Sequence, residues 1–481
     1  MGLVPRACTI ASLTNNVNAE PQTSSLGRIG VVWFRRDLRL ADNPALSEAL
    51  RIHDAIVPLF VWDPRLAESA GEVRLNFLLG CLEKLNESLD GQLVIRSGDP
   101  SKVVAQVAVE AGAEVVWCAE DFGPYGVERD AAVVNALVDR GAQLVRVGSP
   151  YAVAPGALLS GSHRPYQVFT PFSKAWLAHG WSQPIGRPSR RDLHIASLPS
   201  EKLAKPPKVA AVLPLPGEEG AQQRLDHFIN HQVDHYDEQR DRPDLDGTSR
   251  LSPYLKFGCL HPRQILCSLD PTNHAHHRYV TELCWREFYA DVLLHRPDSA
   301  RAPFRHEWRD FAVDSDEKAD ARFDAWCHGQ TGYPIVDAGM RQLLAEGWMH
   351  NRLRMIVASF LVKDLHVDWR RGAMWFMRHL VDGDLASNQH GWQWVAGTGT
   401  DAAPYFRIFN PVTQGKRFDP HGNYVRRWVP ELGSVSDQLI HEPHRSQLAT
   451  LSGEEEYPPP IVEHALERNE SLLRYQKLRA T

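Results

Sequence analysis

The sequence lacks any apolar run of transmembrane length, which excludes a helical membrane span and a membrane partner. It also lacks a C-x-x-C pair. The seven cysteines are odd in number and scattered, which argues against structural zinc and favours a reducing compartment, the cytoplasm. No metal cluster or nucleophile triad has convincing spacing, so we expect no metal ion. The net charge of −6 shows no excess of positive charge, so any DNA contact must come from a local basic patch.

What is present is the composition of an ordinary globular protein of two or three domains, with 481 residues, 43% hydrophobic and 23% charged. Fourteen tryptophans are more than usual, so some indoles are expected to serve a site rather than to fill the core. Residues 1–28 are polar and lack the apolar centre of a secretory signal, which predicts a disordered tail. We expect the protein to be a monomer.

Short β-branched runs alternate with helical patterns over residues 29–150, which predicts an α/β domain with a doubly wound parallel sheet. A G-x-G-x-x-G motif is missing after the first run, so the main cofactor is not placed in this domain. The predicted strands are Ile29–Phe34, Ala55–Trp62, Leu93–Arg96, Glu114–Cys118 and Leu144–Val147, and the helical patterns between them include Arg74–Leu89, Lys102–Ala111 and Gly126–Val138.

Residues 151–215 are irregular and rich in proline, which predicts an interdomain linker with a few ordered pieces, among them Tyr166–Phe172, Lys174 and Trp176. Over residues 216–481 helical periodicity dominates and strand patterns vanish. The sequence therefore predicts an α/β N-terminal domain followed by an all-α C-terminal domain.

The stretch from Gly347 to Pro404 predicts a lined cavity. Its first part is a helix with one apolar stripe facing the core and an unusual uncharged face opposite. A helix buried on both sides would also explain this part alone. Next come two carboxylates, an amide and two indoles, and buried carboxylates without partners are costly. The stripe is Leu353, Ile356, Val357, Phe360 and Leu361, the opposite face is Trp348, Asn351 and Met355, and the polar and indole residues are Asp382, Asp384, Asn388, Trp392 and Trp394.

A second helical face, in the segment ELCWREFY, carries Glu282, Trp285, Arg286 and Tyr289. An ordinary amphipathic helix would show a similar face. Joined to the first cavity face, however, Trp285 and Trp394 can form two apolar walls for a flat apolar molecule. Glu282 can then hydrogen-bond the polar edge of that molecule.

The segment GTSRLSP, residues 247–253, predicts an anion-binding cradle. Ser252 can cap a helix whose first residue is Pro253. The preceding hydroxyls and backbone N–H groups, together with the helix N-terminus, suit a phosphate. A capped helix with a polar lead-in would explain Ser252 and Pro253, but not the side chain of Arg250.

The segments WMHNRLRM, DGDLASNQHGWQW and TGTDAAPYFRIFNP resemble the flavin-binding domain of the photolyase and cryptochrome family. The resemblance extends from about Gly30 to Pro460, and the branch it most resembles is the class I cyclobutane pyrimidine dimer photolyases. It implies a light-dependent lyase that acts on DNA containing such dimers, by electron transfer from excited flavin. The alternative is a cryptochrome-like blue-light signalling flavoprotein. That alternative predicts a long C-terminal extension and a replaced cavity wall, and the sequence has neither.

The resemblance implies FAD in its reduced form, FADH⁻, bound in the helical domain. Arg354 and Asp382 match the ion pair that flanks the flavin ring. Asn388 matches the residue facing flavin N5, where plant cryptochromes have an aspartate; an amide there favours repair. The implied FAD-binding residues are Thr248, Ser249, Arg250, Leu251 and Ser252 at the phosphates, together with Tyr236, Trp348, Arg354, Asp382, Asp384 and Asn388.

The implied catalytic residues enclose a dimer turned out of the duplex, as photolyases are known to do. They are Glu282, Trp285, Asn351, Met355 and Trp394. The (6-4) photolyases carry a histidine near the position of Met355, and DASH cryptochromes usually lose the second tryptophan. Both features favour the cyclobutane dimer.

Trp392 and Trp369 match two members of the tryptophan chain that photoreduces oxidised flavin in the family. The outermost member is missing, because alignment places Asp316 where a tryptophan is expected. Either Trp308 or Trp375 substitutes for it, or photoreduction is impaired.

The N-terminal domain matches the antenna domain of the family. The loop beginning at Glu120 resembles that of members using 8-hydroxy-5-deazaflavin, which we expect rather than methenyltetrahydrofolate. The implied antenna residues are Arg36, Asp121 and Lys256, although ordinary surface charges would look the same and some members bind no antenna. The implied DNA contacts are Arg240, Arg286 and Arg352, and a basic run of Lys416, Arg417, Arg426 and Arg427 that would equally suit a solvated surface.

Overall fold

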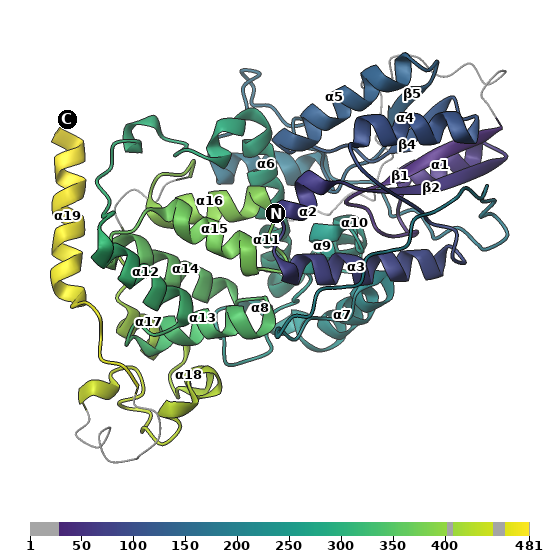
Figure 1. The fold of residues 1–481 in the computed structure, drawn as a ribbon. Helices are drawn as coiled ribbons and strands as arrows, with labels where there is room; N and C mark the ends of the chain where they lie inside the picture. Colours follow the sequence, from purple (N-terminus) through teal and green to yellow (C-terminus); the bar gives the residue numbers. More distant parts are fainter. Residues whose placement is uncertain (1–27, 402–406, 446–456, 481) are drawn as a thin grey trace, which may run out of the picture.

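The structure is a computed structural model that describes residues 28–401, 407–445 and 457–480. The predicted tail lies outside the described residues, apart from Arg28. An α/β part built on one sheet packs against a larger helical part (Figure 1). Within the described ranges, no helix is both long enough and apolar enough to cross a membrane.

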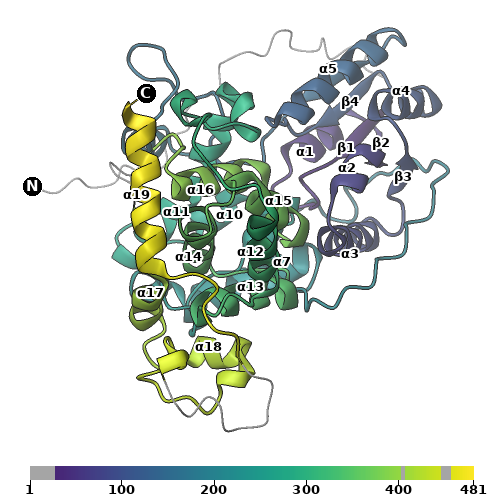
Figure 2. The ribbon, with the colours of Figure 1, turned by 60° about the vertical axis from the view of Figure 1, so that its left-hand side comes forward.

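The α/β part contains a parallel sheet in the strand order β3-β2-β1-β4-β5. Its strands are β1 (Ile29–Phe34), β2 (Ala55–Trp62), β3 (Val94–Ser97), β4 (Val115–Cys118) and β5 (Gln143–Arg146), and its helices are α1 (Pro44–Ile52), α2 (Pro64–Ser69), α3 (Glu72–Ser88), α4 (Pro100–Ala111) and α5 (Pro124–Val138). In β1, Val31 and Trp33 pack with α4 and α5, whereas Val32 and Phe34 pack with α1 and α3. Helices therefore cover both faces (Figure 2), and the predicted doubly wound parallel sheet is confirmed.

The predicted element boundaries differ from the observed ones mainly at helix starts. The bounds of β1 and β2 are as predicted, and β3, β4 and β5 differ at their ends by one residue. Helices α4 and α5 begin earlier than predicted, at Pro100 and Pro124, because proline is well suited to the first helical position. The side chain of Asp99 also caps α4 by accepting from the amide of Ser101.

The predicted linker contains a helix of its own, α6 (Phe169–His179). It is held by Glu287, a buried carboxylate that accepts from the indole of Trp176 (2.6 Å) and from the amide of Ala152 (2.6 Å). Further along, residues 194–196 run beside the start of β2, where the amide of Ile56 donates to the carbonyl of His194 (2.8 Å). The segment is therefore fixed to both parts.

The rest of the described chain is helical, and its strands are confined to the α/β part. The predicted apolar stripe from Leu353 to Leu361 is buried, as expected of a central helix. After it, Phe360–Asp364 forms one π-helical turn. The helices are α7 (Gly217–His231), α8 (Tyr236–Gln239), α9 (Ser252–Phe257), α10 (Pro262–Cys267), α11 (His274–His295), α12 (Glu317–His328), α13 (Pro334–Glu346), α14 (Asn351–Ser359), α15 (Trp369–His379), α16 (Leu385–Ala396), α17 (Pro411–Phe418), α18 (Asn423–Trp428) and α19 (His464–Ala480).

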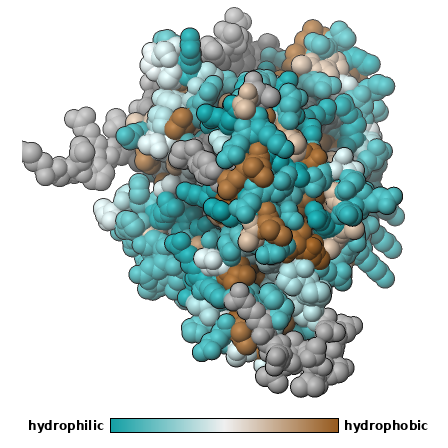
Figure 3. Space-filling view, turned by 90° about the vertical axis from the view of Figure 1, so that its left-hand side faces the viewer, coloured by the Kyte–Doolittle hydropathy of each residue, from teal (hydrophilic) through white to brown (hydrophobic). Residues whose placement is uncertain are grey.

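Helix α19 packs along the outside of the helical part, next to the π-helical turn. The hydroxyl of Ser471 donates to the carbonyl of Lys363 (2.6 Å), which fixes α19 to that turn. Leu466 and Leu473 stay exposed on its outer side. The face that carries α19 is mostly hydrophilic, with small hydrophobic patches between charged side chains (Figure 3).

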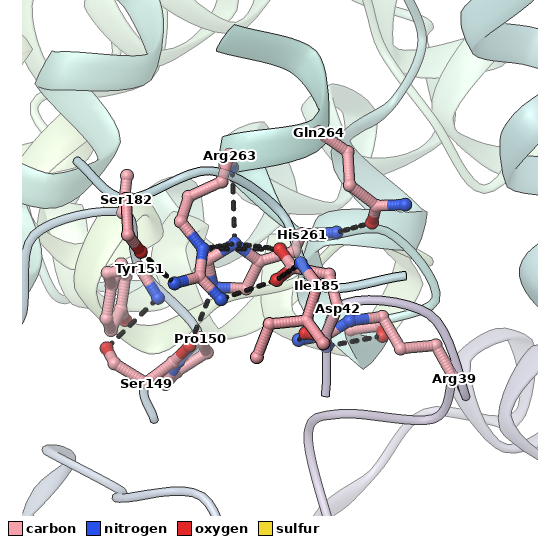
Figure 4. Close-up of polar contacts among 12 residues, drawn as sticks. Arg39, Asp42, Ser149, Pro150, Tyr151, Ser182, Ile185, His261, Arg263 and Gln264 are labelled. Carbon is pink, nitrogen blue, oxygen red and sulfur yellow. Dashed lines mark hydrogen bonds and ion pairs between the residues drawn. The ribbon is translucent and has the colours of Figure 1, made fainter. Parts of the chain in front are cut away.

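A buried polar cluster joins the two parts at Asp42, in the loop between β1 and α1 (Figure 4). The Asp42 carboxylate accepts from Arg263 Nη2 (2.6 Å) and from the amide of Ile185 (2.9 Å), and His261 Nδ1 lies 3.2 Å away. Arg39 Nη2 donates to the main-chain oxygen of Asp42 (2.6 Å). One carboxylate thus links the α/β part, the linker and the start of α10.

The surroundings of Asp42 and His261 decide which of the two carries a charge at neutral pH. Burial alone would raise the pKa of Asp42, but its contacts with His261, Ile185 and Arg263 hold that pKa below its usual range. Burial lowers the pKa of His261 to about 4, so this imidazole is neutral. The Asp42 carboxylate is therefore the anion that faces the guanidinium of Arg263.

We predict that Asp42→Asn destabilises the protein by about 3 kcal/mol, because a buried cation would lose its counterion. Asparagine tolerates the positive φ of 51° at this position, so backbone strain does not confuse the result. The measurement is the free energy of unfolding from guanidinium titration.

The matched control is Glu87→Gln, which removes the exposed pair with Lys84 on α3 and should change stability by less than about 1 kcal/mol. If Asp42→Asn were no more destabilising than this control, the interface would not depend on the Asp42 charge.

Candidate functional site

Helices α11, α14 and α16 carry the predicted catalytic residues, and α16 packs against both of the others. Glu282 and Trp285 lie on α11, Asn351 and Met355 on α14, and Trp394 on α16. Trp285, Met355 and Trp394 are half-buried, whereas Asn351 is exposed at the first residue of its helix. The three helices therefore bring the two predicted faces of the cavity to one region of the helical part.

The predicted ion pair of Asp382 and Arg354 is present. Asp382 Oδ2 accepts from Arg354 Nη2 (2.8 Å) and from the hydroxyl of Ser252 (2.6 Å). The other carboxylate oxygen, Oδ1, is buried and has no hydrogen-bond partner in the structure. Since a buried acceptor without a donor is costly, Asp382 Oδ1 is a natural acceptor for a ligand.

Ser252 was predicted to cap the helix that begins at Pro253, and this was wrong. The N-cap of α9 is Leu251, and Ser252 is the first helical residue. Its hydroxyl bonds Asp382 instead, because a carboxylate accepts more strongly than neutral partners do.

Asp384 is directed toward the α/β part. Its Oδ1 caps α16 by accepting from the amide of Ser387 (3.2 Å), and its Oδ2 lies 2.7 Å from Arg36 and 3.8 Å from Lys256. Burial would raise the pKa of Asp384, but the charges of Arg36 and Lys256 hold it well below its usual range. Burial also lowers the pKa of Lys256 to about 8. Two of the predicted antenna residues therefore converge on a predicted flavin residue.

The third predicted antenna residue, Asp121, pairs with Arg129 (3.1 Å). Arg129 in turn lies over the ring of Trp33 (5.0 Å) and contacts the buried Asp130 (2.8 Å). These contacts give Asp121 a structural partner in the α/β part, next to the Arg36 cluster.

The predicted phosphate cradle is held by a residue that the sequence did not single out. Arg224 donates to the carbonyls of Ser249 (2.7 Å) and Thr248 (2.6 Å). Ser249 also accepts from the hydroxyl of the buried Tyr279 (2.8 Å). Arg250 has a φ of 50°, and its guanidinium lies over the indole of Trp348 at 4.3 Å. No motif marks Arg224, because its role depends on a fold contact between α7 and this loop.

Helix α16 presents an open face beside the Asp382 carboxylate. Asn388, Gly391 and Trp394 are spaced by three residues and share this face. A Cβ added at Gly391 would meet no atom within 4 Å, so the helix has free space there. The Asn388 amide donates to the carbonyl of Ala373 (3.1 Å), which fixes its orientation. A buried orphan acceptor next to an open helix face fits the edge and plane of a flavin ring.

Arg74 of α3 is a further residue that the sequence did not indicate. Its Nη1 is buried without a hydrogen-bond partner, and a Cβ added at Gly383 would lie only 2.6 Å from it. Burial lowers the pKa of Arg74 to about 10, and the charge of Asp382 opposes that shift. Only glycine at 383 leaves room for this guanidinium between the two carboxylates.

The Glu282 carboxylate is held by two arginines. Arg240 donates a hydrogen bond to it, and Arg278 lies 3.8 Å away on the next turn. Trp285, one turn along α11, stacks face to face on Phe169 at 3.6 Å with an interplanar angle of 4°. Phe169 was not among the predicted residues, because it comes from the linker.

Two of the predicted DNA-binding arginines, Arg286 and Arg352, make different contacts in this structure. Arg286 donates to the carbonyls of Pro150 and Leu255, both at 3.1 Å, so it lies between the end of the α/β part and the helical part. These contacts give Arg286 structural partners, and its contact with DNA stays a prediction. Arg352 pairs with Asp241 (2.8 Å) and its Nη1 reaches Met355 Sδ at 3.8 Å, so it borders the site.

The basic run of the C-terminal helices is largely paired within the chain. Lys416 contacts Glu442 (2.5 Å), and Arg426 contacts Asp437 (2.7 Å). Arg417 lies over the ring of Phe418 at 5.1 Å. This pairing favours a structured charged surface over a dedicated phosphate groove.

An aromatic chain leads from Trp392 toward the outside. Trp392 and Trp326 are buried and meet edge to face at 6.1 Å. Trp326 stacks on Phe323 at 5.8 Å, and Phe323 meets the half-buried Trp375 at 6.4 Å. Trp369 is buried at the start of α15, the helix that also carries Trp375.

The position aligned with the missing outermost tryptophan has a structural role here. Asp316 caps α12 by accepting from the amide of Ala319 (2.9 Å). Of the two proposed substitutes, Trp308 packs on Phe311 and Tyr475, at 5.3 and 5.7 Å. Trp375, by contrast, contacts the chain that leads to Trp392.

A further residue of α16, His390, is buried among hydrogen-bond partners and an aromatic ring. It is buried on α16, hydrogen-bonded through Nδ1 to the carbonyl of Ala386 (2.8 Å) and through Nε2 to Ser299 (3.0 Å), and it stacks on Tyr289 at 5.5 Å. Burial lowers its pKa to about 4. The imidazole is therefore neutral in the folded protein at neutral pH.

Two family models match the chain. One, described as the FAD binding domain of DNA photolyase, matches residues 279–477, and the other, described as DNA photolyase, matches residues 30–189. The deoxyribodipyrimidine photo-lyase of Synechococcus sp. is 40% identical over 478 residues, which cover 93% of this chain and 96% of that protein.

Solved structures of a photolyase and a cryptochrome also superpose on this chain. A bacterial class III photolyase from Agrobacterium tumefaciens superposes with a TM-score of 0.88 at 37% identity, over 96% of this chain and 100% of that chain. A cryptochrome of Synechocystis sp. superposes with a TM-score of 0.83 at 30% identity, over 93% of this chain and 99% of that chain. The class I branch stays a prediction, because a class III protein is among these similar structures.

We predict that stability falls as the pH drops below about 6.5, in part because of His390. Its folded pKa of about 4 is lower than the ordinary value of 6.5, so the unfolded chain binds one more proton between these pH values. Stability is complete above pH 6.5 and is lost toward pH 4, at about 1.4 kcal/mol per pH unit for one such group.

His390→Gln, whose amide can keep both hydrogen bonds, should reduce the pH dependence of the free energy of unfolding by the contribution of about one proton. Guanidinium unfolding between pH 5 and 7.5 measures this dependence. His277→Gln, at an exposed position on the same helix as Trp285, is the matched control. Equal slopes for wild type and His390→Gln would contradict the prediction.

Proposed function

The chain belongs to the photolyase and cryptochrome family, and on that premise we propose that it is a light-dependent DNA repair enzyme, a deoxyribodipyrimidine photo-lyase. Its substrate would be DNA containing cyclobutane pyrimidine dimers. The observation that carries the proposal is the packing of α11, which carries Glu282 and Trp285, against α16, which carries Asn388 and Trp394. A flavin site and two indole walls then lie on adjoining helices.

The flavin would be held by residues already in place. Asp382 Oδ1 is available to an N–H at the edge of the ring, and the hydrogen bond from Arg354 orients that carboxylate. The open face at Gly391 leaves space for the ring beside Asn388. When bound in its reduced form and excited by light, FAD supplies the electron that opens the cyclobutane ring.

The dimer would be held by residues of the opposite wall. Trp285 and Trp394 provide aromatic contact, which at about 1–3 kcal/mol per base offsets the few kcal/mol that extrusion from the duplex costs. Asn351 is exposed and can hydrogen-bond the bases directly. Glu282, which accepts a hydrogen bond from Arg240, would reach the carbonyls of the dimer through a bridging water.

For the antenna we propose 8-hydroxy-5-deazaflavin rather than methenyltetrahydrofolate. The support is the similarity of the Glu120 loop and the presence of Lys256, half-buried beside Asp384. Arg36 and Lys256 together offer two cations to an anionic pigment at the interface of the two parts.

We further propose that Trp375 replaces the missing outermost member of the electron chain. An electron from an external thiol reductant would enter at Trp375 and pass inward to Trp326 and Trp392, across the ring of Phe323, so that Trp326 takes the middle place that the resemblance gives to Trp369. Trp308 packs instead on Phe311 and Tyr475.

We predict that the purified protein, illuminated with an oligothymidine that contains one dimer, restores the intact thymines. Trp285→Ala should weaken dimer binding in the dark by about 5- to 100-fold while keeping the flavin, because one stacking surface is lost. Gel-shift titration and the flavin absorbance measure the two effects.

Trp181→Ala, which removes a half-buried indole of the linker that packs on Trp176, is the matched control and should bind dimers normally. A protein that binds flavin but leaves dimers intact under light would contradict the repair function and favour the cryptochrome alternative. Normal lesion binding by Trp285→Ala would show that the cavity is misplaced.

We also predict that Trp375→Phe slows the light-driven reduction of bound oxidised FAD by dithiothreitol, because a phenyl ring is harder to oxidise than an indole. Trp308→Phe is the control and should photoreduce like the wild type. Dimer repair by either variant should be normal once the flavin has been reduced chemically. Time-resolved absorbance under blue light is the measurement, and an unchanged rate in Trp375→Phe would exclude this entry point.

A further inference from the structure

Trp285 has only one ring face left for a ligand. Phe169 covers the other face in a parallel stack at 3.6 Å, which is van der Waals contact and leaves no space between the rings. Phe288 and Tyr289 approach the indole at 5.8 and 5.4 Å with tilted planes, so they pack against its edges. The indole is nevertheless half-buried rather than buried. Its accessible surface therefore belongs to the face opposite Phe169.

Phe169 is itself a fixed, buried ring. It is 8% exposed, begins α6, and packs on Phe288 at 5.8 Å. Helix α6 packs against α11, which carries Trp285. A ring held in this way backs the indole and does not occupy the ligand face.

The first turn of α6 is tied to the segment that follows α16. The hydroxyl of Thr400 donates to the carbonyl of Gln167 (2.8 Å), and the amide of Phe169 donates to the carboxylate of Asp401 (3.4 Å). Trp394 lies on α16, shortly before these residues. Phe169, whose ring packs on Trp285, is thus attached to the segment that follows α16, the helix that carries Trp394.

We propose that Phe169 is a positioning residue for lesion binding. It fixes the plane of Trp285 and, through the hydrogen bond of its amide to Asp401, the separation of that plane from Trp394, so that the slot admits a splayed pyrimidine pair. It contacts neither the dimer nor the flavin. The role follows from the stack and the tie to α16, and it rests on the proposed repair function.

The test is Phe169→Leu, which keeps an apolar side chain but removes the flat backing surface. The dissociation constant for an oligothymidine with one dimer, measured in the dark, should rise about three- to tenfold. Affinity for the same oligothymidine without a dimer should not change. At saturating DNA, the number of dimers split per absorbed photon should equal that of the wild type, because the flavin environment is untouched.

Phe172→Leu is the matched control. Phe172 lies on the same helix, is 3% exposed and packs on Phe288 at 5.2 Å, without a ring contact to Trp285 among those found in the described residues. It should bind the dimer like the wild type. Phe169→Tyr, which keeps a six-membered ring, should restore most of the affinity, and Phe169→Met provides a second ring-free variant if Phe169→Leu yields no folded protein.

Equal lesion affinity in Phe169→Leu and wild type would overturn the proposal, as would an equal loss in Phe172→Leu, which would show a general packing effect. A loss of repair per photon with unchanged affinity would overturn it too. These outcomes are distinct from failure of the proposed function, since in that case the wild-type protein itself would not prefer the dimer or split it under light.

Discussion

The contact between Arg36 and Asp384 is the interaction on which the relation of the two parts depends. Asp384 begins α16, the helix that carries Asn388 and Trp394, and Arg36 follows the central strand β1. The carboxylate stays ionised in a buried place because two cations, Arg36 and Lys256, outweigh the cost of burial. Without the Asp384 carboxylate, Arg36 and Lys256 would lose the anion that lies between them, and the start of α16 would no longer be fixed to the sheet.

Other polar contacts follow the same rule, since charged side chains bind the backbone or the charges of the other part or of the linker, beside apolar contacts such as that of Phe77 with Tyr254 and Phe257. Asp42 joins the loop after β1 to Arg263, Glu287 binds the amide of Ala152, and Arg286 binds the carbonyl of Pro150. Apolar contacts alone would bury surface without fixing the angle between the two parts. A hydrogen bond between charged groups is strong only over a narrow range of distances and angles. An arrangement of this kind suits a protein in which energy absorbed in one part is to be used at a fixed place in the other.

Local patterns predicted the fold well. β-branched runs gave the strands because a buried parallel strand needs them, and the stripe from Leu353 to Leu361 gave the central helix because its period matches the helix. The ion pair of Arg354 and Asp382 was also predictable, but through family motifs rather than through spacing. What failed depended on partners distant in the sequence. Ser252 has an ordinary local pattern, and only the fold decides that its hydroxyl binds the Asp382 carboxylate instead of capping a helix.

The D-G-D segment shows why a motif identifies residues without assigning their directions. In an extended chain, residues two apart lie on the same side, so Asp382 and Asp384 would be expected to serve one ligand. A turn at Asp382, with the amide of Gly383 donating to the carbonyl of Leu380 (3.3 Å), breaks that pattern. Asp382 then meets Arg354 while Asp384 meets Arg36, and the glycine between them makes room for Arg74. The two carboxylates therefore have different roles: Asp382 makes the ion pair with Arg354 on α14, and Asp384 fixes the start of α16 to the residue that follows β1.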